Sequence, residues 1–365
     1  MKIVLNNNDK SVLEQYFLQQ ENNIFASEQD SLFLNEHYDD ISSEDLKPCL
    51  ANGMNEEDGM KSLFLSILDE EENGLEEALS SCLFGKIDCL HDKDFSNNPY
   101  FKYVKLKDFK DGKYSIETNY YAPYECFVYD QTKQGNEKYA EVTPIGYFRK
   151  KFPYYVMNEN NVVWMSITPY EINTMKDALD RCHGNVMTFG LGLGYYAFMA
   201  SMKDDVKSVT IIENSKSVIS LFEKHILPFF PHKEKIRIVK GDAFISMKKA
   251  DEFDTVFIDI YHSAEDALPL YIKFKGIEKK CSIKTEVDYW IEDSILTYFR
   301  RFVLAFLYEN YYGETKEEDY LNDSTEEDRI MEKIYLSLKD RDFASIDEID
   351  SLLSEKGLKE LISSF

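Results

Sequence analysis

The sequence lacks the residue groupings that mark metal centres and disulfide scaffolds. Its 365 residues include six cysteines and six histidines, but no CxxC pair and no cluster of either type at metal-ligand spacing. We therefore expect no bound metal, and we expect the cysteines to be free thiols in a reducing cytoplasmic compartment.

Long apolar runs are also missing, because charged residues interrupt each one well before it reaches membrane-spanning length. The stretch MKIVLNNNDK at the start of the chain lacks the basic and then apolar pattern of a secretion signal. Both observations predict a cytoplasmic protein with no membrane partner.

Positive charge is scarce in two segments of a chain whose net charge is −25. Residues 26–80 carry 16 acids and two lysines, and residues 314–350 carry 14 acids and five basic residues. Solvated helix faces are the simplest explanation, and a cationic ligand or partner is the sharper one. Because phosphates would be repelled, we expect no nucleic-acid partner.

Four regions follow one another along the chain. We predict an acidic helical accessory domain over 1–95, where Met60, Phe64 and Leu68 fall at helical spacing among carboxylates. A β-rich segment over 96–167 contains short aromatic runs and a NENN turn suited to a hairpin. The last two regions are a cofactor-binding core over 168–280 and a helical C-terminal region over 281–365 that packs on this core.

The core begins with a helix start and then alternates between strands and helices. Thr168-Pro-Tyr-Glu171 is a capping box with proline at the first helical position, and Gly184 suits the end of that helix. Four strand-like runs, each followed by a helical run, then occupy 185–275. This alternation predicts an α/β fold with a doubly wound, Rossmann-like, mostly parallel sheet.

Three glycines stand at alternate positions in NVMTFGLGLGYYAFMA, where the first strand of the core meets its helix. Parallel strands end at the sheet edge where ligands bind, and glycine lets a ligand lie directly against the backbone. Gly190, Gly192 and Gly194 therefore predict a nucleotide-like ligand. A tight turn that only packs the helix on the sheet is the alternative.

Two acids at the same sheet edge narrow the choice of ligand. Glu213 ends the second strand, where a carboxylate accepts hydrogen bonds from ribose hydroxyls. Asp242 follows the third strand and could accept the adenine amino group. The sequence from Gly192 to Ala197 also satisfies the dinucleotide pattern GxGxxA, so NAD stays open as an alternative.

Four motifs of this region together resemble those of a known enzyme family. The motifs VMTFGLGLG, Glu213, GDAF and FDTVFIDIYH resemble, in order and spacing, those of class I S-adenosylmethionine-dependent methyltransferases. The last motif and the preceding β-rich segment are also similar to the spermidine-synthase branch of that superfamily.

The resemblance implies S-adenosylmethionine as cofactor. It implies that the three glycines line the methionine and ribose, that Glu213 holds the ribose, and that Asp242 and Ala243 flank the adenine. Thr188 departs from the pattern, because the family often has an acid there that holds the ligand's amino group. A fifth strand and a final hairpin are not evident after Lys280, which indicates a shortened sheet or an edge covered by helices.

Three residues just past the fourth strand are candidate catalytic groups. Asp259 is the strongest, since a carboxylate at the end of a buried strand is costly unless it is used, although it could also cap the next helix. Tyr261 could cover a sulfonium by cation–π attraction, and His262 could act as a base. Ordinary packing and surface exposure are the alternatives for these two.

A second acidic stretch, TEVDYWIEDS, reads as a helix start with Asp288 and Glu292 on one face. It could hold an amine-bearing acceptor, and a solvated helix start is the alternative. Arg300 and Arg301 could pair with its acids or neutralise an acidic acceptor.

These features favour a methyltransferase that acts on a small-molecule or protein acceptor. The alternatives are an aminopropyltransferase of the polyamine type, a non-catalytic Rossmann-like binding module and an NAD-dependent oxidoreductase.

Overall fold

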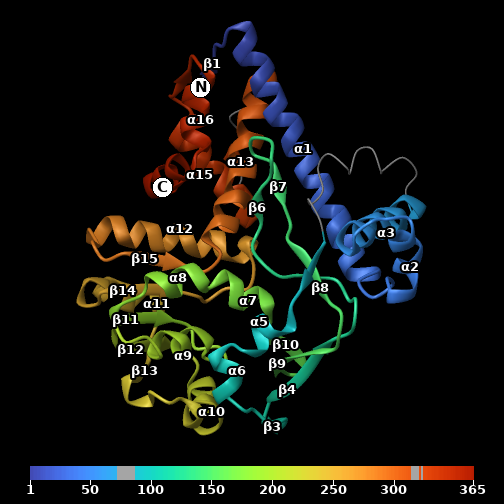
Figure 1. Ribbon diagram of the computed structural model, residues 1–365. Helices are drawn as coiled ribbons and strands as arrows, with labels where there is room; N and C mark the ends of the chain where they lie inside the picture. Colours follow the sequence, from blue (N-terminus) through green and yellow to red (C-terminus); the bar gives the residue numbers. More distant parts are fainter. Residues whose placement is uncertain (72–86, 314–319, 322–323) are drawn as a thin grey trace.

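The computed structural model describes residues 1–71, 87–313, 320–321 and 324–365 (Figure 1). Cys82 and the end of the predicted acidic helix, residues 72–84, lie outside the described residues. The five described cysteines are free thiols. In the described ranges, no three His, Cys, Asp or Glu side chains are grouped so that they could hold a metal ion. No helix of the described chain is both long and apolar enough to cross a membrane.

Five strands, all parallel, form the largest sheet, in the order β13-β12-β11-β14-β15. The chain is therefore a mixed α/β protein with a parallel sheet, and this strand order is compatible with a Rossmann-like fold. The strands are β11 (Gly184–Phe189), β12 (Val206–Glu213), β13 (Ile236–Lys240), β14 (Thr255–Ile258) and β15 (Val287–Tyr289).

Helices cover both faces of this sheet. On one face, Tyr196 of α9 stacks on Phe257 of β14 with ring centroids 3.9 Å apart. On the other face, the ring centroid of Phe274 of α12 lies 6.0 Å from that of Phe189 of β11. Phe189 pairs with Ile258 and therefore points to the same face of the sheet as Ile258. Phe257 is the next residue of that strand and points to the opposite face, because successive side chains of a strand alternate. The helices are α9 (Tyr195–Ser201), α10 (Lys216–His225), α11 (Ala243–Ser246) and α12 (Ala264–Cys281).

The fifth strand, which is not evident in the sequence, is present as β15. The strand β15 is only three residues long and pairs with β14, so that Asp288 lies beside Phe257. Three residues are too few for strand periodicity to be visible in a sequence. The placement of Asp288 and Glu292 on one helix face is wrong, since α13 (Glu292–Tyr312) begins only after Ile291. Ile291 turns the chain with a φ of 50°, which is rare for a β-branched residue.

The helix start at Thr168 is confirmed, but its continuation differs. The capping box between Thr168 and Glu171 opens α7 (Pro169–Thr174), and a second helix, α8 (Lys176–Arg181), follows Met175. Gly184 does not end this helix. It begins β11, with a φ of 64°.

An antiparallel sheet precedes the core, with the strand order β10-β9-β4-β3. The hairpin at NENN is confirmed: Asn160 and Asn161 have φ of 53° and 66°, as a tight turn between two strands requires. The strands of this sheet are β3 (Phe109–Asp111), β4 (Tyr114–Tyr121), β9 (Phe152–Glu159) and β10 (Val162–Ile167). Smaller sheets are formed by β2 (Asp88–Leu90), β5 (Phe127–Val128) and β8 (Ile145–Phe148), and by β6 (Lys133–Gln134) and β7 (Glu141–Val142).

The first helix, α1 (Asn7–Glu36), connects two parts of the molecule. Leu13 and Phe17 belong to the main core and lie where α1 runs along α13, whereas Phe33 packs in a second core with Met60 and Phe64 (Figure 1). The two ends of the chain also meet, because β1 (Lys2–Ile3) pairs with β16 (Asp342–Phe343). The remaining helices are α2 (Ser43–Ala51), α3 (Glu56–Glu71), α5 (Asp92–Ser96), α6 (Pro99–Tyr103), α15 (Glu326–Leu338), α16 (Ile346–Leu353) and α17 (Glu355–Ser364), with short 3-10 turns at 227–229, 233–235 and 247–252.

Candidate active site

A cavity of about 560 Å³ lies at the carboxyl ends of β11, β12, β13 and β14. Residues from β10 and α7 form its outer wall. The structure brings together all nine residues that the sequence predicts for the site. Those lining the cavity are Gly190, Gly192, Gly194, Glu213, Asp242, Ala243, Asp259, Tyr261 and His262.

The three glycines of the loop after β11 have different reasons to lack a side chain. A Cβ on Gly190 would lie 1.9 Å from the carbonyl oxygen of Asp259, and one on Gly194 would lie 2.4 Å from the ring of Phe222. Both positions are therefore required by packing within the protein. A Cβ on Gly192 would meet no atom closer than 3.5 Å, so this residue leaves space open in the cavity. All three have positive φ, which favours glycine.

Glu213 closes the glycine loop onto the end of β12. Its carboxylate accepts hydrogen bonds from the backbone N–H groups of Leu191 (3.2 Å) and Ser215 (2.6 Å). Each carboxylate oxygen can accept a further hydrogen bond, so Glu213 keeps acceptor capacity on the cavity side. The loop is held from outside by Tyr100, whose hydroxyl donates to the carbonyl of Leu193 at 2.7 Å.

Asp242 is the N-cap of α11. Its Oδ1 accepts a hydrogen bond from the backbone N–H of Ile245 at 2.9 Å, and its side chain is exposed. The cap leaves Oδ2 for a ligand, and the half-buried Ala243 beside it presents a small apolar surface to the cavity.

Among the four described carboxyl groups that line the cavity, Asp259 has the fewest partners. No hydrogen-bond donor or cation lies on its side chain in the described part of the protein. Burial raises the pKa of Asp259 to about 7, and the negative charge of Glu171 contributes to the rise. A carboxyl group with a pKa near neutrality can take up and release a proton under physiological conditions.

Glu171 of α7 lines the cavity and acts electrostatically on Asp259, although its sequence pattern indicates only a helix start. Its carboxylate accepts hydrogen bonds from Ser166 Oγ (2.9 Å), from the backbone N–H of Thr168 (2.8 Å) and from the Thr168 hydroxyl. Burial nevertheless raises the pKa of Glu171. The capping residue thus also lines the cavity, which its spacing alone does not reveal.

Tyr261 and His262 differ in what they can contribute. The Tyr261 hydroxyl donates to the carbonyl of Trp290 at 2.7 Å, and burial followed by the nearby Asp259 charge raises its pKa well above the usual range. Tyr261 is therefore protonated at neutral pH and offers its ring to the cavity. His262 is exposed, and its Nδ1 lies 3.3 Å from Asp266.

The charge of the cavity has one sign. Glu171, Glu213, Asp242 and Asp259 line it, and the described lining contains neither lysine nor arginine. Thr188 also lines the cavity at the position where the resembled family often has an acid. A ligand that carries positive charge would relieve this imbalance.

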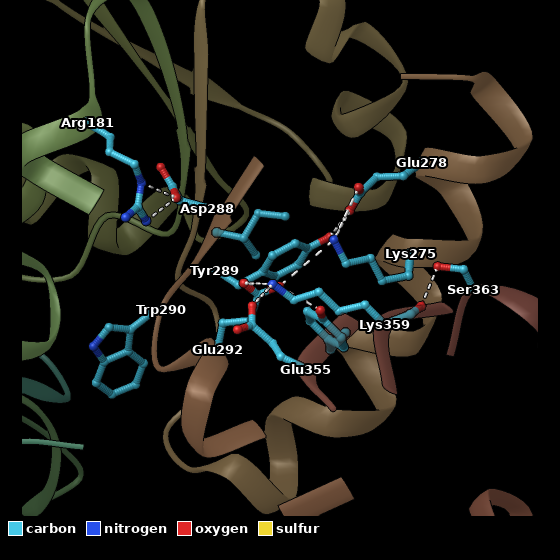
Figure 2. A network of polar contacts seen from close by, with 12 residues as sticks. Arg181, Lys275, Glu278, Asp288, Tyr289, Trp290, Glu292, Glu355, Lys359 and Ser363 are labelled. Atoms are coloured by element: carbon cyan, nitrogen blue, oxygen red, sulfur yellow. Dashed lines mark hydrogen bonds and ion pairs between the residues drawn. The ribbon is translucent and has the colours of Figure 1, made fainter. Parts of the chain in front are cut away.

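Trp290 forms part of the cavity wall and is fixed on two sides. Its Nε1 donates to Thr174 Oγ1 at 2.8 Å, and its ring stacks on Tyr261. Behind it lies a polar network, shown in Figure 2, in which Arg181 binds Asp288 at 2.5 Å and Lys359 binds Glu292 at 3.0 Å.

The predicted pairing of the two arginines of α13 with the acids of this stretch is wrong. Arg300 donates to the carbonyl of Leu353 at 3.0 Å, and Arg301 pairs with Glu141.

The strand β10, which also lines the cavity, was not predicted as part of the site. Val163, Trp164 and Met165 of β10 line it, and they belong to the β-rich segment rather than to the core. Their hydrophobic pattern gave a strand, but no local signal places that strand over a sheet edge formed elsewhere in the chain.

Comparisons with known proteins give only remote similarities. No protein-family model matches the chain, and no curated protein matches it. Two solved structures of spermidine synthase, one from Thermotoga maritima and one in complex with the transition state analogue AdoDATO, each align with a TM-score of 0.28 and 14% identity. Each alignment covers 47% of this chain and 60% of that one.

A structure from Streptococcus mutans, named as a SAM-dependent methyltransferase, aligns with a TM-score of 0.25 and 14% identity. The alignment covers 36% of this chain and 43% of that chain. The chain thus spans less than two thirds of each of these proteins. Similarities of this size do not assign an activity.

Proposed function

We propose that this protein is an S-adenosylmethionine-dependent methyltransferase acting on an amine of a small molecule or protein. The observation that supports this most is the cavity at the sheet edge, where the described lining has four carboxyl groups and no lysine or arginine around the open face of Gly192. An adenosyl sulfonium compound is both a nucleoside and a cation, so it matches the shape and the charge of such a site.

Each of these residues would contact a different part of the ligand. Gly192 leaves room for it against the backbone, and Glu213 has acceptor capacity for ribose hydroxyls. Asp242 and Ala243 stand where the adenine would lie. The ring of Tyr261 offers a π face to positive charge.

Asp259 would handle the proton of the acceptor. The bound cofactor supplies an activated methyl carbon, and an amine must be neutral to attack it. An ammonium group that enters the cavity can pass its proton to Asp259, whose pKa of about 7 suits acceptance near neutral pH. Glu171 on the other side would attract the same ammonium group.

Aminopropyl transfer is a second candidate, and the charge of the cavity favours it. S-adenosylmethionine carries a carboxylate, whereas its decarboxylated form has only positive charges. The described lining offers no lysine or arginine to the carboxylate. The acidic lining would therefore favour the decarboxylated donor over the intact one.

Isothermal titration calorimetry tests the proposal. We would titrate S-adenosylmethionine, S-adenosylhomocysteine, the decarboxylated donor and NAD. Heat from the first two supports methyl transfer. A clear preference for the decarboxylated donor supports aminopropyl transfer instead. Binding of NAD alone would point to an oxidoreductase, and no heat from any compound would leave a non-catalytic module.

The variant Glu213→Ala gives the matched test of the pocket. We expect it to lose donor binding by about tenfold or more. Its melting temperature without ligand should fall modestly, because the backbone N–H groups of Leu191 and Ser215 lose their acceptor, but the protein should stay folded. Glu234→Ala is the control, because Glu234 is an exposed acid outside the cavity. Equal donor affinity in both variants would contradict the assigned pocket.

A further inference from the structure

A second cavity, of about 610 Å³, lies on the other side of α7 from the candidate active site. Residues of the β6–β7 hairpin, the start of α8, the first turns of α13 and Glu355 of α17 line it. Figure 1 shows this hairpin beside α13. The proposed transferase function makes no use of this cavity.

Half of the charged side chains that line this second cavity already have ion-pair partners. Asp130 binds Lys133 at 2.7 Å, and Glu355 binds Lys359 at 2.6 Å. Glu141 is paired with Arg301.

Four charged residues of the lining have no ion-pair partner in the described chain, and two are cations and two are anions: Lys176, Arg300, Asp177 and Asp293. The uncommitted charges of this cavity are therefore of both signs, in contrast to the first cavity.

Arg300 is a partly buried cation of this lining that has no ion-pair partner in the described residues. Its Nε donates to the carbonyl of Leu353, and its guanidinium lies 5.4 Å from the ring centre of Tyr139. Burial lowers the pKa of Arg300, as expected for a cation taken out of water. The two Nη groups have no acceptor in the described residues, and a guanidinium fork is suited to a carboxylate.

Asp293 is the corresponding anion. Its Oδ2 accepts a hydrogen bond from Gln131 Nε2 at 3.1 Å, and Asp177 lies near enough to act on it electrostatically. Burial raises the pKa of Asp293, and the negative charges of Glu355 and Glu292 add to the effect. Lys359, which pairs with both of those glutamates, opposes this rise, so the carboxylates left for an ammonium group are Asp293 and Asp177.

We propose that the second cavity binds a small zwitterion of the amino-acid type, with its carboxylate at Arg300 and its ammonium group at Asp293 and Asp177. Neither a dicarboxylate nor a diamine satisfies both ends of this arrangement. The proposal does not depend on the proposed transferase function, because the two cavities have no lining residue in common.

The two cavities nevertheless share a wall. Glu171 and Met175 line the first cavity, and Asn173 and Lys176 line the second, all within two consecutive helices. S-adenosylmethionine itself ends in an amino acid, so a zwitterion could also enter the first cavity. The experiment must separate these two sites.

The test is calorimetry on the full chain with a length series of ω-amino acids, from 3-aminopropanoate to 6-aminohexanoate. Glutarate and 1,5-diaminopentane are charge controls for the five-carbon member. We expect at least one amino acid to bind with a Kd below about 1 mM and at least about tenfold more tightly than either control. Binding should persist when S-adenosylhomocysteine saturates the first cavity. Absence of amino-acid binding, equal binding of a control, or competition with the nucleoside would each overturn the proposal.

Variants locate the site. Arg300→Met should weaken amino-acid binding by about tenfold or more. Arg329→Met is the matched control, since Arg329 pairs with Glu326 on the surface of α15, outside the cavity. If Arg300→Met does not fold, Arg300→Lys and Asp293→Asn replace it, each with an expected loss of about tenfold. Unchanged affinity in a folded Arg300 variant and in Asp293→Asn would overturn the proposal.

Discussion

Acidic side chains gather on both sides of Trp290, and the two groups differ in their partners. On the cavity side, Asp259 and Glu171 have no cation beside them in the described structure. On the other side, Arg181 binds Asp288 and Lys359 binds Glu292, as Figure 2 shows. The same residue types thus serve different purposes: paired carboxylates hold the chain in place, and unpaired ones keep their charge available for a ligand.

The largest effect on turnover should come from a change to the carboxyl groups that have no cation beside them. Replacing Asp259 with asparagine removes the proposed proton acceptor and changes little else, because the Asp259 side chain makes no hydrogen bond in the described structure. We expect a loss in kcat of about 10²–10⁴-fold, the range of general base catalysis, with donor affinity within about threefold of the native value. Steady-state kinetics and calorimetry measure the two quantities.

Asp204→Asn is the control for this change, since Asp204 is an exposed acid outside the cavity. If Asp259→Asn turned over as fast as that control, Asp259 would not be the base.

Removing an ion pair on the other side of Trp290 should reduce the stability of the fold rather than the turnover rate. Arg181→Met leaves the buried carboxylate of Asp288 without its cation, at an expected cost of about 1–3 kcal/mol in the free energy of unfolding. Burial raises the pKa of Asp288 and Arg181 opposes this rise, so removing Arg181 raises the pKa further. The carboxyl then protonates more readily in the folded state, and the loss should be larger at pH 8 than at pH 5.

Urea denaturation at the two pH values measures this loss. The double variant Arg181→Met/Asp288→Asn removes the buried charge and should regain most of the stability. A double variant no more stable than Arg181→Met would show that the ion pair is not the source of the effect.

The space for a ligand in the cavity can be reduced without changing any of its carboxyl groups. Gly192→Ala places a methyl group in the open part of the cavity and should weaken donor binding by about tenfold. Gly112→Ala is the matched control, because Gly112 also has a positive φ, 62°, and open space around its Cβ position. Both variants should lose about 1 kcal/mol of stability from backbone strain. Equal donor affinity in the two variants would show that Gly192 does not face the ligand.

Local sequence patterns predicted the parallel sheet and the cavity residues at its edge. Alternating strands and helices gave the parallel sheet, and the rule that such strands end at one edge brought Gly192, Glu213 and Asp259 into one cavity. Partners from elsewhere in the chain were not predictable. Trp164 reaches the cavity from a separate sheet, and Arg181 meets Asp288 across 107 positions of sequence. Such contacts depend on tertiary packing, which no short pattern records.

The smallest effect should come from changing the electrostatic surroundings of Asp259. The negative charge of Glu171 raises the pKa of Asp259, so Glu171→Gln should lower it by less than about one unit. Glutamine also completes a capping box, so α7 should keep its start. Asp259 acts as a base only when deprotonated, so the rise of activity with pH should move to lower pH. The pH dependence of kcat/KM measures this shift, with Glu265→Gln on the exposed start of α12 as control. A profile that does not move, or that moves to higher pH, would mean that Glu171 does not act on the catalytic proton through its charge.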